Sequence, residues 1–172
     1  MDKQQIVQRS CGKFRREWES SSMKDKSYTP ENYPILRYGD VLLMLAEAEN
    51  EAHQGPTDLA YECINEIRQR AGISKLEGLS YTDFQQAVRD ERARELCFES
   101  LRKYDLVRWG IYVEAVHDKL GAATQDKRWA TGNQFIGARD YAARTQEKHQ
   151  FLPIPTKELD VNGKLEQNKY WQ

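Results

Sequence analysis

Three glutamates recur four residues apart in the run that begins at Glu91, and they are the residues best suited to chemistry. On a helix Glu91, Glu95 and Glu99 would lie on one stripe, with Arg102 three residues further along. Two carboxylates act as general acid and general base when their surroundings separate their pKa values, and clustered carboxylates hold the metals of helical di-metal sites. Acid–base catalysis and metal binding are therefore the first hypotheses for this run.

The same run also fits a structural ion network, and we favour that interpretation. It contains no histidine to complete a di-metal site. Three acids one turn apart repel each other unless cations lie against them, and a solvated helix face would more often mix its signs. Arginine suits such pairing because its planar guanidinium binds a carboxylate through two parallel hydrogen bonds. The expected partners are Arg68, Arg70, Arg92, Arg102 and Arg108.

A second group of candidate residues lies in the segment 121–150, where hydrophobic periodicity is weak. Loops presented by a rigid scaffold often carry function. A pyranose stacks its apolar face on an aromatic ring, while guanidinium and amide groups hydrogen-bond its hydroxyls. The candidate glycan contacts are Arg128, Trp129, Asn133 and Phe135. The alternative, that Trp129 and Phe135 only anchor a long loop, stays open at this point.

Asp105, Arg108 and Trp109 also allow two interpretations. They could form a sugar subsite, or they could be an ion pair at the start of a helix beside a core tryptophan. We favour the ion pair.

Composition excludes several classes of protein. The chain has 172 residues, which predicts one domain with a sizeable core. A net charge of -1 and a pI of about 6.3 argue against a nucleic-acid binder, and 39% hydrophobic residues argue against disorder. The three cysteines lack C-x-x-C spacing, and no glycine-rich phosphate loop or nucleophile pair is present. We therefore expect no metal, no cofactor and no enzymatic activity.

Hydrophobic spacing predicts an all-α fold that opens with a helical hairpin. After a polar, extended lead-in over residues 1–34, the first helix runs from about Gly39 to Gln54. A turn at Gly55-Pro56 leads to a second helix that ends near Ala71, so the two resemble a tetratricopeptide unit in size. The residues expected to face inward are Val41, Leu42, Leu45, Ala48 and Ala52 in the first helix, and Leu59, Ala60, Cys63, Ile64 and Ile67 in the second.

Two further helices complete the expected core over residues 35–120. A sequence at Ser80 and Asp83 that resembles a capping box predicts a third helix from about Asp83 to Leu101, with Thr82 as the competing N-cap. A fourth should run from about Tyr104 to Leu120. Residues 121–172 should form an irregular loop and a proline-containing tail.

Four motifs in one order give the chain a resemblance to the SusD/RagB family. The run from Glu91 to Trp109 resembles the pattern E-R-x-x-E-L-x-F-E-x-x-R-x-x-D-L-x-R-W. Arg37 to Ala48 resembles R-Y-x-D-V-L-L-x-x-A-E-A, and Ile64 to Gly72 resembles I-N-x-I-R-x-R-A-G. The closing motif comprises Phe151-Leu152-Pro153-Ile154-Pro155, Glu158, Gln167-Asn168 and Tyr170. Together they cover roughly residues 33–171.

The resemblance implies a function that composition and spacing do not. SusD-like proteins are outer-membrane lipoproteins of Bacteroidetes-type bacteria that capture glycans or other nutrients and form a lid over a SusC-like TonB-dependent transporter. The match implies the C-terminal part of such a protein, without its signal peptide and lipidation site. The alternatives are a helical-repeat protein–protein interaction module and, less favoured, a carboxylate-based hydrolase.

Overall fold

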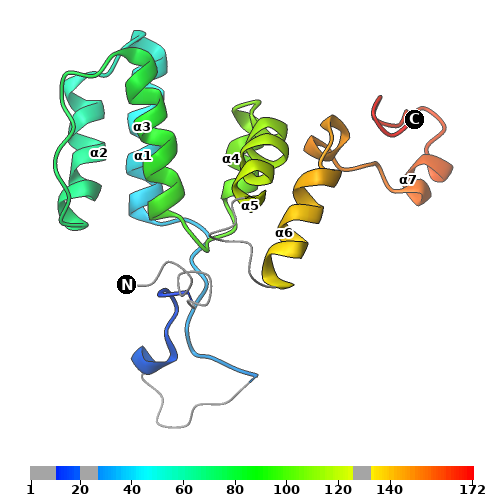
Figure 1. Ribbon diagram of the computed structural model, residues 1–172. Coiled ribbons are helices and arrows are strands. Elements are labelled where there is room, and N and C mark those ends of the chain that lie inside the picture. The colour runs from blue at the N-terminus through cyan, green and yellow to red at the C-terminus, as the bar shows by residue number, and fades with distance from the viewer. Residues whose placement is uncertain (1–10, 20–26, 126–132) are drawn as a thin grey trace. The chain divides into compact units, whose positions relative to one another are not determined.

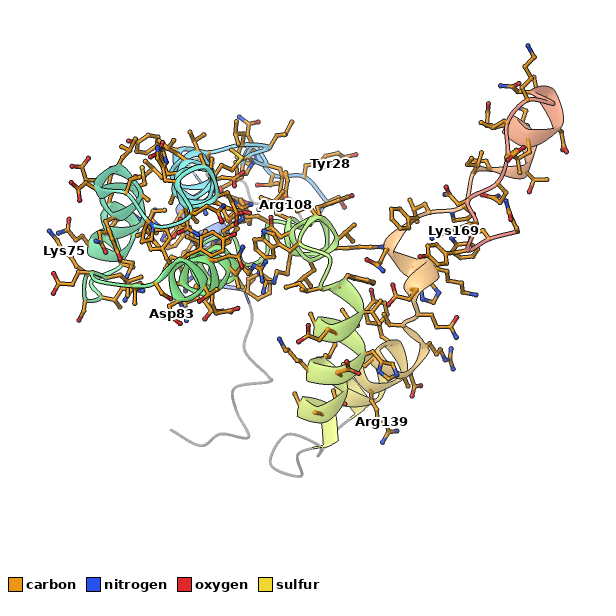
Figure 2. All side chains as sticks on the ribbon, turned by 90° about the horizontal axis from the view of Figure 1, so that it is seen from above. Tyr28, Lys75, Asp83, Arg108, Arg139 and Lys169 are labelled. Atoms are coloured by element: carbon orange, nitrogen blue, oxygen red, sulfur yellow. The ribbon has the colours of Figure 1, made fainter. Side chains whose placement is uncertain are left out.

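The structure is a computed structural model that describes residues 11–19, 27–125 and 133–172, and every regular element in these ranges is a helix (Figure 1). The predicted all-α class is confirmed. The described residues fall into two compact units, which we call the hairpin unit (Cys11–Arg102) and the C-terminal unit (Lys103–Gln172). Side chains crowd together between the helices of the hairpin unit, whereas along the last residues of the C-terminal unit they stand apart (Figure 2).

The hairpin unit is built on three α-helices preceded by a short 3₁₀ turn. Its elements are η2 (Arg16–Trp18), α1 (Tyr38–His53), α2 (Asp58–Arg70) and α3 (Tyr81–Glu95). The Thr57 hydroxyl accepts a hydrogen bond from the Ala60 N–H at 3.1 Å and so caps the start of α2. The Ser80 hydroxyl caps α3 in the same way, accepting from the Asp83 N–H at 3.2 Å. The predicted hairpin and the predicted Ser80 cap are confirmed.

A Schellman motif ends α2 and turns the chain towards α3. Gly72 has a φ of +73°, where an L side chain would be strained. The Ile73 N–H donates to the Arg68 carbonyl at 2.9 Å, and the Gly72 N–H donates to the Gln69 carbonyl at 3.0 Å. The glycine therefore satisfies carbonyls that the helix end would otherwise leave without partners.

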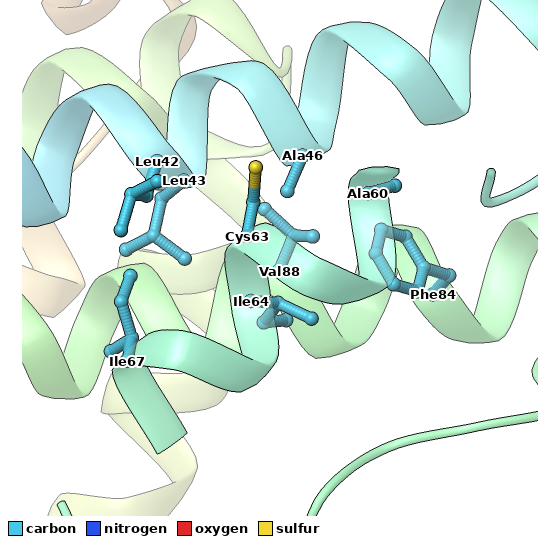
Figure 3. Packing of buried hydrophobic residues seen from close by; sticks show 9 residues of the cluster. All are labelled: Leu42, Leu43, Ala46, Ala60, Cys63, Ile64, Ile67, Phe84 and Val88. Atoms are coloured by element: carbon cyan, nitrogen blue, oxygen red, sulfur yellow. The ribbon is translucent and has the colours of Figure 1, made fainter. Parts of the chain in front are cut away.

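The core of the hairpin unit lies where α1, α2 and α3 meet (Figure 3). Phe84 is fully buried, and its ring meets the edge of Tyr61 with centroids 5.1 Å apart. Each large side chain buried here contributes roughly 1.5–3 kcal/mol. The buried cluster comprises Leu42, Leu43, Ala46, Ala60, Cys63, Ile64, Ile67, Phe84 and Val88.

The inward face of α1 differs from the predicted one. Val41 and Leu45 are exposed, whereas Leu43 is fully buried, so of the stripe predicted for this helix only Leu42 is in the core. The helix is apolar on more than one side, and periodicity alone therefore does not define its phase. Two buried polar residues contribute to the phase: Asp40 binds Arg92 at 2.8 Å, and the Asn50 amide donates to the Tyr81 carbonyl at 3.2 Å.

Leu59 of α2 is likewise 43% exposed, contrary to the prediction. The other four residues predicted to face inward from α2 are buried.

The third helix ends six residues earlier than predicted. Its C-cap is Leu96, and residues 96–100 form a turn in which Phe98 and Ser100 have φ values of 66° and 60°. Left-handed backbone at two non-glycine residues is uncommon and interrupts helical hydrogen bonding. Glu99 therefore leaves the helical stripe that carries Glu91 and Glu95.

The C-terminal unit is a series of shorter helices. They are α4 (Arg102–Arg108), which begins at the last residue of the hairpin unit, η3 (Glu114–Leu120, a π-helix), α5 (Gly121–Gln125), α6 (Asn133–Arg144), η4 (Glu147–Gln150) and α7 (Thr156–Val161). The single helix predicted from Tyr104 to Leu120 is interrupted at Gly110, whose φ is +69°. The segment after residue 120 contains three α-helices as well as irregular stretches.

A small core holds the helices of this unit together. Leu106, Tyr112 and Val116 are buried, and α6 packs against both η3 and α5. Tyr112 and Tyr141 of α6 are hydrogen-bonded through their hydroxyls.

Candidate functional site

The acidic run that begins at Glu91 is an ion network within the hairpin unit. Glu91 is only 3% exposed, and its carboxylate accepts a hydrogen bond from Arg68 Nη1 of α2 at 2.8 Å. Arg94 Nη1 lies 3.4 Å from the same oxygen. The prediction that Arg68 is one of the cations that bind this run is confirmed.

Arg37 joins the other two carboxylates of the run. Its Nη1 lies 2.6 Å from Glu95 Oε1, and its Nε and Nη2 lie 2.7 and 2.8 Å from the two carboxylate oxygens of Glu99. Its Nη2 also donates to the Glu95 carbonyl at 2.6 Å. Arg70 adds a second cation to Glu95, and Lys13 adds one to Glu99. One guanidinium thus links the end of α3 to the turn that follows it.

The start of α1 leaves room for this guanidinium. Arg37 is the N-cap residue of α1 and has extended backbone. A Cβ on Gly39 would lie 3.2 Å from Arg37 Nη1 and 3.2 Å from Glu95 Oε1, which is tighter than nearly all Cβ contacts. The R-Y-G-D sequence therefore supplies both the cation and the space that it occupies.

Some of the cationic partners were predicted from the sequence, and others were not. Arg68 and Arg70 do bind the run. The remaining predicted arginines bind elsewhere: Arg92 binds Asp40, Arg108 binds Asp105, and Arg102 donates to the Arg89 carbonyl at 3.1 Å. Arg37 and Lys13 were missed because both lie outside the helices in which partners were sought. The only sequence signal for Arg37 was its place at the head of a motif.

The network holds the carboxylate of Glu99 in the ionised form. Burial by itself would raise the pKa of Glu99, but hydrogen bonds from Arg37 and Lys13 outweigh it, and the pKa is lowered below its ordinary value of 4.5. A general acid must keep its proton near neutral pH. Glu99 is therefore unsuited to act as a general acid, and its contacts with Arg37 and Lys13 support a structural role.

Metal binding finds no support in the described ranges. Within residues 11–19, 27–125 and 133–172, no three histidine, cysteine, aspartate or glutamate side chains are placed to share an ion. The prediction that no Glu-x-x-His pattern appears was wrong, because Glu114 and His117 have this spacing of di-metal helices. Their side chains are exposed and bind Lys119 and Asp118.

The predicted glycan contacts are not placed by the structure. Arg128 and Trp129 lie outside the described residues. Asn133 and Phe135 lie in the first turn of α6, where only the backbone is described. The hypothesis of a sugar contact here stays a prediction.

The ion pair that we favoured is formed by Asp105 and Arg108, and Trp109 lies beside it. Asp105 is 3% exposed, and its Oδ1 accepts from Arg108 Nε at 3.0 Å and lies 2.9 Å from Nη2. The Arg108 guanidinium carbon lies 4.7 Å from the Trp109 ring centroid, which is a cation–π contact. The carboxylate of Asp105 and the guanidinium of Arg108 are thus paired with each other.

The C-terminal unit contains a cavity that sequence analysis did not predict. Its volume is about 240 Å³. Its lining comes from α4, from Tyr112 two residues before η3, from α6 and η4, and from the tail, which are spread over nearly seventy residues. The lining residues are Lys103, Tyr112, Tyr141, Arg144, Thr145, His149, Phe151, Leu152, Pro153 and Trp171. No spacing in the sequence brings such residues together.

Fold and network together define a helical scaffold of the tetratricopeptide-like class, whose acidic run is held by arginines. Residues 7–171 match the SusD family, and the chain belongs to that family. It is 40% identical over 139 residues to SusD-like protein P25 of Formosa agariphila and 29% identical over 148 residues to SusD-like protein P2 of the same organism. These matches cover 78% and 80% of this chain but 23% and 25% of the relatives.

Solved structures of SusD-like proteins are also similar to this chain. A SusD homolog from Bacteroides thetaiotaomicron is 38% identical and superposes with a TM-score of 0.67 over 81% of this chain and 27% of its own. A SusD superfamily protein from Bacteroides vulgatus is 31% identical, with a TM-score of 0.57 over 79% of this chain and 27% of its own. The chain thus spans about a quarter of the length of these relatives. Among the described helices, none has the length and apolar character needed to cross a bilayer.

Proposed function

We propose that this chain is the C-terminal part of a nutrient-binding protein that captures glycans at the bacterial outer membrane. Membership of the SusD family over residues 7–171 is the observation that carries the proposal. In this proposal a SusC-like TonB-dependent transporter is the partner, and a lipid anchor outside this chain holds the protein at the membrane. Binding rather than catalysis agrees with an acidic run whose three carboxylates are all bound by cations.

Within this chain we propose Trp129 as the centre of the glycan contact, with Arg128, Asn133 and Phe135 around it. An indole offers a flat apolar face to a pyranose, and stacking of this kind is worth on the order of 1 kcal/mol by analogy with aromatic pairs. The guanidinium and the amide supply the planar donors that sugar hydroxyls accept.

The test is a Trp129→Ala variant of a full-length SusD-like protein that carries this chain. A glycan array first identifies a ligand, and calorimetry then compares the variant with the parent. We expect affinity to fall about fivefold while the melting temperature stays within a degree or two, since 1 kcal/mol corresponds to that factor. A fall of several degrees with unchanged affinity would make Trp129 a loop anchor instead.

A second candidate function is contact with another protein, and the outer face of α1 favours it. Tyr38 is 64% exposed, Val41 40% and Leu45 38%, and these positions recur at helical spacing. Ile35 and Leu36 immediately before the helix are 88% and 59% exposed. Such a contiguous apolar face is more typical of an interface than of a surface in water.

Co-purification tests this second function. A full-length protein with Val41→Ser and Leu45→Ser should lose its partner while keeping its glycan affinity. Retention of the same partner by the variant would exclude this face from the interface.

A further inference from the structure

The cavity of the C-terminal unit has the size and the rigid lining of a binding site for one small ring. Its volume of about 240 Å³ lies below the roughly 300–1,000 Å³ of sites for drug-sized ligands, so it suits a single sugar ring better than a chain of them. Trp171 is held in place because its indole N–H donates to the carbonyls of Lys148 and Phe151, at 3.1 and 3.0 Å. The Tyr112 and Tyr141 hydroxyls hold each other. The aromatic walls are therefore preorganised.

The ionisable groups of the lining favour an acceptor-rich ligand. Among the described residues that line it, the cations are Lys103 and Arg144, and none is an aspartate or a glutamate. Within the described ranges neither cation has a carboxylate at salt-bridge distance, although Lys103 Nζ lies 5.6 Å from the Tyr112 ring centroid. Two cations beside one cavity repel each other, and an anion between them would relieve that repulsion.

His149 adds a third donor. Its Nδ1 accepts a hydrogen bond from the Gln146 N–H at 2.9 Å, so the proton of the neutral ring is on Nε2. The His149 ring also meets the Trp171 ring, with centroids 6.1 Å apart. Lys103, Arg144 and His149 therefore all carry N–H donors and all line a cavity that is also lined by aromatic rings.

We propose that this cavity binds one acidic sugar residue, a pyranose that bears a carboxylate or a sulfate. The anionic group is held by Lys103 and Arg144, and the apolar face of the ring lies against the Tyr141 and Trp171 side of the cavity. The choice of a sugar, rather than another anion with an apolar face, rests on the proposed glycan-binding function. The site is separate from the predicted contact at Trp129.

The experiment titrates the 172-residue chain with three methyl glycosides and one salt, and follows the indole N–H signal of Trp171 by NMR. The glycosides are methyl glucuronide, methyl glucoside sulfate and neutral methyl glucoside, and the salt is sodium sulfate. We expect the acidic glycosides to bind at least about tenfold more tightly than the neutral one, because one charge-assisted hydrogen bond is worth that factor. Comparing the carboxylate with the sulfate identifies which anion the cavity prefers.

Two variants test the assignment of the cations. Arg144→Gln should weaken the binding of the acidic glycosides about tenfold. Arg139→Gln is the matched control, since Arg139 is an exposed arginine of the same helix that does not line the cavity and projects away from α6 (Figure 2). It should leave binding unchanged. If Arg144→Gln fails to fold in a thermal melt, Lys103→Met makes the same test.

Each contrary outcome overturns a definite part of the proposal. Equal binding of the neutral and acidic glycosides would refute selectivity for acidic sugars. Sulfate ion that binds as tightly as the glucuronide would reduce the cavity to a simple anion site. If no glycoside moves the Trp171 signal, the cavity is not a sugar site. None of these results bears on the proposed function. That proposal is tested separately, by the glycan titration of the full-length Trp129→Ala variant.

Discussion

The ion network of the hairpin unit and the cavity of the C-terminal unit use their cations in opposite ways. In the hairpin unit Arg37, Arg68 and Arg92 are each bound to a carboxylate that is nearly or fully buried. In the C-terminal unit Lys103 and Arg144 lie beside a cavity whose described lining residues include no carboxylate. A cation already bound to an acid stabilises the fold and has little left to offer a ligand, whereas a cation that faces a cavity is available. The comparison separates a scaffold from a candidate binding site within one short chain.

The largest expected effect comes from removing the central cation of the hairpin unit. Arg37→Met leaves Glu99 and Glu95 buried without their shared partner, which should cost about 3–5 kcal/mol of the free energy of unfolding. Urea unfolding followed by circular dichroism measures it. Arg70→Met is the matched control, because Arg70 also binds Glu95 but is 62% exposed, and it should cost less than about 1 kcal/mol. Similar losses for the two variants would contradict the assignment of Arg37 as the centre of the network.

Acid should weaken the same network. The pKa of Glu99 is lowered in the folded state, so its contribution to stability is present above the ordinary value of 4.5 and is lost as the pH falls through the folded value. Glu99→Gln should therefore be less stable than the parent at neutral pH, and this difference should shrink as the pH falls below about 4.5. Thermal melts of both proteins over this range make the measurement. A difference that stays constant with pH would refute the linkage.

A smaller effect is expected at the tyrosine pair of the C-terminal unit. Tyr141→Phe leaves the buried Tyr112 hydroxyl without its partner, which should cost about 1–2 kcal/mol. Burial and the hydrogen bond with Tyr141 raise the pKa of Tyr112 to about 12. The unfolded chain loses this proton near the ordinary value of 10, so stability should decline as the pH rises from there towards 12. The tyrosinate absorbance checks the titration, and a Tyr112 that ionises near 10 would exclude the raised pKa.

The smallest effect should follow removal of the cations beside the cavity. Lys103→Met and Arg144→Gln should each change the free energy of unfolding by less than about 0.5 kcal/mol, as for surface residues that stabilise no buried acid. Urea unfolding of these variants and of Arg37→Met under the same conditions makes the losses in free energy of unfolding comparable between the two units. A loss above about 2 kcal/mol for either variant would place these cations in the scaffold and erase the contrast between the units.

Sequence patterns predicted the helices better than their ends or their faces. The capping side chains of Thr57 and Ser80 are local, so the starts of α2 and α3 were predicted to within a residue or two. The end of α3 at Glu95 was not, because the left-handed backbone of Phe98 and Ser100 has no signature in their residue types. The buried face of α1 was mistaken because a helix that is apolar on several sides takes its phase from the elements against which it packs.

The sequence by itself determined the all-α class, the hairpin, the family and the need for cations around Glu91, Glu95 and Glu99. Each rests on local spacing or on the order of motifs. Tertiary structure alone assigned the central cation to Arg37, 58 residues from Glu95 along the chain, and brought Lys103, Arg144 and Trp171 to one cavity. Pairings over such distances depend on how helices pack and on which space a glycine leaves open, and no local pattern of residues records either.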